Sequence, residues 1–112
     1  MPDKHFQLHT TTLDSAPHAI EVTVNGEVDA ASADQFTRAI QALPGPRPLV
    51  VNLSSAFYFD SAGFAALDRL LADKTIVLVV EPTSALFAAT QLMCMPAHHS
   101  CADARKALPQ LR

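Results

Sequence analysis

Residues 57–65, Phe57-Tyr58-Phe59-Asp60-Ser61-Ala62-Gly63-Phe64-Ala65, carry the most informative pattern of the chain. Three consecutive aromatic residues run into an Asp-Ser pair, and a helical apolar pattern follows from Gly63 to Ala72. The three rings could offer an exposed aromatic patch to a partner, but because alternate positions of a strand face inward, two of the three are expected in the core. Ser61 is expected at the helix N-cap, where its hydroxyl accepts from the backbone N–H groups that open the helix. The segment therefore predicts a corner at which the chain turns directly into a helix.

Ser61 is open to three interpretations on these residues alone. The simplest is that it only caps the helix, because serine after aspartate is common at helix starts. The free N–H groups and the helix dipole also favour an anion there, so a phosphate on Ser61 would be tolerated locally. It would add about −1.5 to −2 charge beside Asp60 and disrupt an interface packed on this corner. A nucleophilic serine needs a positioned base, and the chain has no Gly-x-Ser-x-Gly elbow, so we predict that it is not an enzyme.

The sequence before this corner predicts a hairpin, a helix and a strand. Residues 5–13 and 20–24 alternate apolar and polar side chains around a turn cluster, which is typical of two antiparallel strands. Ser32 and Gln35 then have the spacing of a capping box. The apolar run 49–53 predicts a strand that is covered on both faces.

The sequence after the corner continues the alternation of strands and helices. Residues 76–80 form a second apolar run, and right-handed crossovers place both runs parallel to the second hairpin strand. A helix is expected over 83–93, a short strand near 97–99, and a last helix from Ser100 to Leu108. The predicted fold class is α/β, with a mixed sheet of four to five strands and helices packed mainly on one face.

Composition narrows the classes of function. The 112 residues fit one domain, and 49% apolar against 17% charged residues argues against disorder. The net charge of −3 and the scattered Lys and Arg residues do not favour nucleic acid as a partner. No apolar run reaches the roughly 18 residues of a membrane span, and residues 1–5 lack a secretory signal. A cytoplasmic location without membrane insertion is expected.

No cofactor is expected from the remaining reactive residues. The only potential metal cluster comprises Cys94, His98, His99 and Cys101. Its spacing, Cys-x₃-His-His-x-Cys, matches none of the usual zinc patterns, and Cys94 is expected to pack at a helix end. The three glycines of the chain do not form a phosphate-binding loop, so an intrinsic nucleotide site is not predicted either.

Several motifs together resemble the STAS domain. They are Gly26-Glu27-Val28-Asp29, the run 49–53 followed by Phe59-Asp60-Ser61-Ala62-Gly63, and the strand 76–80 followed by Pro82. The resemblance covers about residues 5–108 and implies a single STAS-like domain. STAS domains include the bacterial anti-sigma factor antagonists. In these proteins a kinase-type anti-sigma factor phosphorylates the serine after the aspartate, and only the unphosphorylated antagonist binds that factor and frees the sigma factor.

The resemblance also implies roles for individual residues. Ser61 would be the phospho-acceptor, Asp60 would shape its loop, and Gly63 would let the helix start lie close to a partner or to its own sheet. No catalytic residue is implied, and the partner would be an anti-sigma factor of serine-kinase type. The implied partner-binding residues are Asp29, Asp60, Ala62, Gly63, Phe64 and Asp68.

A second group of STAS domains shares part of the pattern. Many phosphorylated members have Ser or Thr where this chain has Ala62, and a second Gly where it has Ala65. The segment Asp-Ser-Ala-Gly also resembles stand-alone STAS subunits of bacterial phospholipid-transport ABC systems. Those subunits bind the transporter ATPase and need no phosphorylation, so this alternative stays open.

Overall fold

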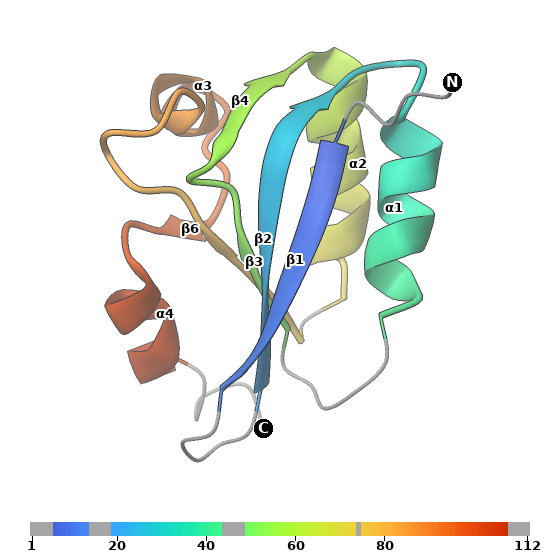
Figure 1. Cartoon of the computed structure of the whole chain (residues 1–112). Helices are drawn as coiled ribbons and strands as arrows, with labels where there is room; N and C mark the ends of the chain where they lie inside the picture. The colour runs from blue at the N-terminus through green and yellow to red at the C-terminus, as the bar shows by residue number, and fades with distance from the viewer. Residues whose placement is uncertain (1–5, 14–18, 44–48, 74, 108–112) are drawn as a thin grey trace.

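The computed structural model describes residues 6–13, 19–43, 49–73 and 75–107. Their elements alternate much as the sequence predicts (Figure 1). In chain order they are β1 (Phe6–Leu13), β2 (Ala19–Val28), α1 (Ala33–Gln41), β3 (Leu49–Asn52), β4 (Ala56–Phe59), α2 (Ser61–Leu71), β5 (Ile76–Val79), α3 (Phe87–Leu92), β6 (Ala97–His98) and α4 (Cys101–Ala107). The predicted turn cluster at 14–18 and the expected end of the last helix at Leu108 lie outside the described residues.

The six strands form one mixed sheet in the order β1-β2-β3-β5-β6, with β4 also paired to β2. β1 and β2 are antiparallel from Phe6 opposite Gly26 to Leu13 opposite Ala19, which confirms the predicted hairpin. β3 and β5 follow in parallel, as right-handed crossovers predict, and the short β6 pairs with β5 in parallel as well. The α/β class is confirmed, and the sheet has one strand more than the four to five expected, because β4 is a strand of its own.

β3 and β4 pair one after the other with the same strand, β2, and a bulge interrupts the pairing of β4 with β2. Ala56 is opposite Gly26, but Tyr58 is opposite the next residue, Glu27, so Phe57 is the extra residue. Gly26 has φ 97°, a backbone conformation that favours glycine. The bulge breaks the alternation of side chains, and Phe57 and Tyr58 are 62% and 49% exposed. The prediction that two of the three aromatic rings are core is therefore wrong.

The main core lies between the sheet and the helices α1 and α2, which cover one face in Figure 1. Four aromatic rings run through it in a chain of contacts. Phe36 is fully buried and packs edge-to-face on Phe6 and Phe59, with ring centroids 5.4 and 5.6 Å away. Phe59 in turn lies 5.7 Å from Phe64 of α2. Because Phe59 and Phe64 bracket the Asp-Ser pair, the core holds the corner from both sides.

The opposite face of the sheet is covered in part by α4. Val50, Val77 and Val79 form a second apolar cluster with Ala104 of this helix. The last helix starts where the sequence predicts, and Ser100 precedes it, with its hydroxyl accepting from the Asp103 N–H at 3.1 Å. With 11 residues, α2 is the longest of the described helices, and none of these helices is both long enough and apolar enough to cross a bilayer.

Two helix starts differ from the prediction. Ser32 is the N-cap of α1 but makes no capping bond, because its hydroxyl faces back to the preceding turn. There it accepts from the Asp29 N–H at 3.1 Å and contacts Asp29 Oδ1 at 3.3 Å, so the capping box with Gln35 is wrong. α3 begins at Phe87 rather than at 83, because the Ser84 N–H bonds to the carbonyl of Glu81 in a turn.

Candidate functional site

Asp60, and not Ser61, is the N-cap of α2. Its backbone is extended, with φ −91° and ψ −171°, and its Oδ1 accepts from the Gly63 N–H at 2.9 Å. The prediction that Ser61 caps the helix is wrong, because the carboxylate one residue earlier already holds the N–H that a cap satisfies. Ser61 is instead the first residue of the helix and is exposed. Within the described part of the chain, its hydroxyl has no hydrogen-bond partner.

The same carboxylate joins two segments that are 30 residues apart. Asp60 Oδ2 accepts from the Ala30 N–H at 3.2 Å, in the turn after β2. The Asp60 N–H also donates to the carbonyl of Val28 at 3.2 Å. We call residues 28–32 and 60–63, which these bonds hold together, the Asp60 corner.

Asp29 lies within the Asp60 corner, as the motif predicts, and most of its bonds are local. Its carbonyl accepts from the N–H groups of Ser32 and Ala33 at 3.0 and 2.8 Å. Its Oδ1 accepts from the Ala31 N–H at 3.0 Å. The Asp29 side chain is half-buried, so it both closes the turn and faces solvent at the corner.

Gly63 marks the closest approach of α2 to the sheet. A Cβ on this residue would lie 2.7 Å from the carbonyl oxygen of Val28 and 2.9 Å from Cδ2 of Phe59. Both distances are shorter than real Cβ contacts, so no other residue fits without a shift of the backbone. Of the two roles expected for this glycine, the structure shows the close approach to its own sheet.

The remaining predicted contact residues differ in exposure. Asp68 is exposed and lies on α2, seven residues after Ser61. At about 1.5 Å rise per residue, the two residues are about 10 Å apart along the helix axis. Ala62 is half-buried. Phe64 is only 6% exposed because its ring packs on Phe59, so it supports the corner from within and offers no side chain to a partner. The sequence favours two of the three aromatic rings in the core over an exposed aromatic patch, but the structure exposes both Phe57 and Tyr58, because the bulge at Phe57 breaks the alternation.

A family model described as "Mlab, STAS domain" matches residues 11–93, which is more than half of the chain. The chain belongs to the STAS family. The crystal structure of an anti-sigma factor antagonist from Mycobacterium paratuberculosis has the same fold, with a TM-score of 0.65 and 23% sequence identity. The alignment covers 92% of this chain and 95% of that one. A search of the curated proteins finds no match.

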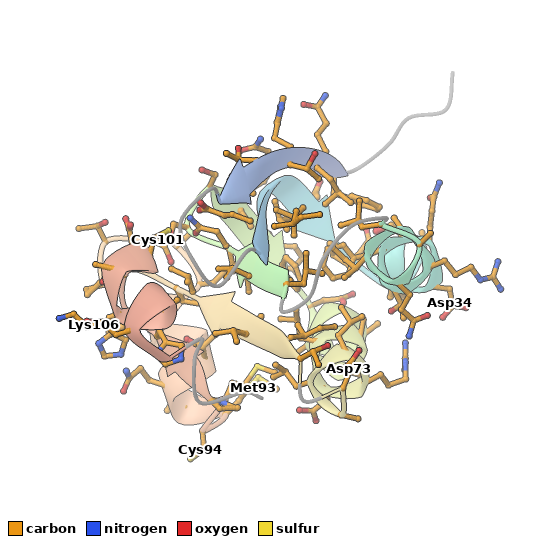
Figure 2. The ribbon with its side chains drawn as sticks, turned by 90° about the horizontal axis from the view of Figure 1, so that it is seen from below. Asp34, Asp73, Met93, Cys94, Cys101 and Lys106 are labelled. Atoms are coloured by element: carbon orange, nitrogen blue, oxygen red, sulfur yellow. The ribbon has the colours of Figure 1, made fainter. Side chains whose placement is uncertain are left out.

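The cysteines of this STAS domain lie well apart in Figure 2. Cys94 follows α3 in a left-handed conformation, with φ 54°, and it is exposed, so the expectation that it packs at the helix end is wrong. Cys101 begins α4, and its thiol contacts Glu21 Oε2 at 3.0 Å. Asn52 donates to the same oxygen at 3.0 Å and ties β3 to this cluster. Among the residues that the structure describes, no three Cys, His, Asp or Glu side chains gather closely enough to hold a metal ion.

Proposed function

We propose that this STAS domain is an anti-sigma factor antagonist that is switched by phosphorylation of Ser61. In the unphosphorylated state it binds a kinase-type anti-sigma factor and so frees a sigma factor. The observation that carries the proposal is the exposed Ser61 hydroxyl, without a partner in the described part of the chain, at the first residue of α2. The fold shared with an anti-sigma factor antagonist also supports it.

The chemistry assigns this chain the role of acceptor only. The partner kinase would transfer the γ-phosphoryl group of its ATP to Ser61 Oγ, which forms one P–O bond and breaks the bond to the bridging β,γ-oxygen. ADP is released, and the hydroxyl proton passes to a base of the kinase. Because Asp60 already caps α2 through Oδ1, the serine can be modified without loss of the helix cap.

The switch follows from where the added charge lies. A phosphate on Ser61 adds about −1.5 to −2 charge beside Asp60 and in the corner that also contains Asp29. Both Asp60 oxygens already accept from backbone N–H groups and offer the phosphate nothing but repulsion. A partner packed on the corner would have to bury this charge unpaired, at a cost of about 2 kcal/mol or more, which is about 30-fold in affinity.

Phosphorylation and binding test the proposal in one set of proteins. Incubation with ATP and the cognate anti-sigma kinase, followed by intact mass analysis, is expected to add one phosphate to the wild type and none to Ser61→Ala. Ser61→Ala keeps binding the kinase, whereas Ser61→Asp binds about 30-fold more weakly or worse. Ser55→Ala, at another exposed serine, is the matched control and accepts phosphate like the wild type. Full phosphorylation of Ser61→Ala would refute the site.

A second candidate function is that of a STAS subunit that binds the ATPase of a phospholipid-transport ABC system. The family description that matches the chain and the Asp60-Ser61-Ala62-Gly63 segment favour it. This role needs no modification, so binding to the ATPase is expected to be the same for Ser61→Ala and Ser61→Asp. Surface plasmon resonance with the candidate ATPase and the candidate kinase separates the two functions, since only binding to the kinase is expected to depend on residue 61.

A further inference from the structure

Phe57 and Tyr58 form an exposed aromatic pair beside the Asp60 corner. The described residues contain four large hydrophobic side chains that are exposed, and these two are neighbours on β4. We propose that the aromatic pair is the apolar centre of the surface that binds the anti-sigma factor, and that it enters an apolar groove of that partner. This inference rests on the proposed function and assigns it a docking surface.

The backbone, rather than loose packing, holds the aromatic pair outward. Phe57 is the extra residue of the bulge, and Tyr58 regains the register opposite Glu27. The following residue, Phe59, is 4% exposed and fixed in the chain of core rings. Without the bulge, strict alternation would place Phe57 on the same side of β4 as the buried Phe59. Bulges of this kind commonly re-aim side chains at functional sites.

The aromatic pair and Ser61 are close enough to meet one partner. Phe57 and Tyr58 precede Ser61 by four and three residues, so their Cα atoms lie within about 14 and 11 Å of it, even for a fully extended chain. A standard interface covers about 800 Å² on each partner, which corresponds to a circle of about 16 Å radius. A partner centred on Ser61 therefore reaches both rings. Aromatic residues are enriched in the centres of such interfaces.

The position of the aromatic pair favours the anti-sigma factor over a second copy of this chain. To phosphorylate Ser61, the kinase must enclose the Asp60 corner, which adjoins β4. A second copy seated on the rings would cover the same corner and shield the Ser61 hydroxyl. An aromatic side chain buries about 150–250 Å² when it is fully covered, and Phe57 and Tyr58 are 62% and 49% exposed, so together they present roughly 200 Å² of aromatic surface. This is about a quarter of the roughly 800 Å² that a standard interface covers on each partner.

Isothermal titration calorimetry with the full-length, unphosphorylated protein and the cognate anti-sigma factor tests the inference. The double variant Phe57→Ala, Tyr58→Ala is expected to bind about 30-fold more weakly or worse, as for other central aromatic residues. The matched control is Leu92→Ala, Met93→Ala, which removes the other two exposed large apolar side chains of the described residues, at the end of α3 and outside β4 and the Asp60 corner. This control is expected to bind within 3-fold of the wild type. Thermal unfolding checks that both variants fold.

The outcomes separate this inference from the proposed function. If the wild type binds and accepts phosphate on Ser61 but the double variant binds within 3-fold, the docking surface is wrong and the proposed function stands. If the wild type neither binds the anti-sigma factor nor accepts phosphate, the proposed function fails, and the inference with it. A concentration-dependent dimer that the double variant abolishes, measured by light scattering, would assign the rings to a second copy and overturn the inference.

Discussion

Replacing Gly63 by alanine tests the geometry that places Ser61 at the edge of the sheet. The added Cβ would lie 2.7 Å from the Val28 carbonyl oxygen and 2.9 Å from the Phe59 ring. Neither neighbour can easily give way. The Val28 oxygen already accepts from the Asp60 N–H at 3.2 Å, and the Phe59 ring is held between two other phenylalanine rings. The expected result is that the start of α2 moves away from β2 and strains the Asp60 corner.

Two opposing terms decide the change in stability. Alanine is a better helix former than glycine by about 1 kcal/mol in a helix interior, and by less in the first turn, where Gly63 lies. Forcing an extra methyl group into a packed site costs about 1–3 kcal/mol. Because the closest atom is a backbone oxygen rather than a flexible side chain, we expect the clash to prevail. The net loss is about 1–2 kcal/mol, which lowers Tm by about 5–10 °C.

Urea unfolding followed by far-UV circular dichroism measures this change. Ala65→Gly is the matched control, because residue 65 is exposed on the same helix and its substitution changes only helix propensity. The control is expected to lose about 0.5–1 kcal/mol. A Gly63→Ala protein as stable as the wild type, or more stable, would contradict the close packing of α2 on the end of β2.

Two further substitutions probe the bonds around the corner and between the helices. Asp60→Ala removes the cap of α2 and the bond to Ala30, so it is expected to lose about 1–2 kcal/mol in urea unfolding, and Asp60→Asn, which keeps a capping oxygen, loses less. Equal losses of stability in Asp60→Ala and Asp60→Asn would show that the capping oxygen of residue 60 does not stabilise α2. Arg69→Ala removes a 3.7 Å contact to Asp34 between side chains that are 54% and 86% exposed, and the expected change is below about 0.5 kcal/mol. A larger drop in a thermal melt would show that this surface pair matters.

The sequence predicts most of the fold because its periodicities are strong. Alternation over 20–24 fixes which face of β2 is buried, and the fully apolar β5 indicates a strand covered on both sides. Asp29 and Asp60 follow the parallel strands β2 and β4 and therefore lie at the same edge of the sheet. Periodicity does not predict β4, so the meeting of these two residues is expected only from the resemblance to the STAS domain.

The details of the corner are beyond reach of the sequence for physical reasons. Aspartate and serine cap helices about equally well, so only the extended backbone of Asp60 decides which of Asp60 and Ser61 does so. A single extra residue in a strand leaves no mark on hydrophobic periodicity, so the bulge and the exposure of Phe57 stay hidden. Ser32 could equally bond forward into its helix or back to the turn, and the structure shows the second.

The proposed switch is measured by titrating this STAS domain with the proposed anti-sigma factor partner in a calorimeter, before and after stoichiometric phosphorylation of one preparation. We predict that the phosphate is found on Ser61 and that the modified protein binds at least about 30-fold more weakly. Equal affinities of the two forms would show that negative charge at the start of α2 does not control partner binding.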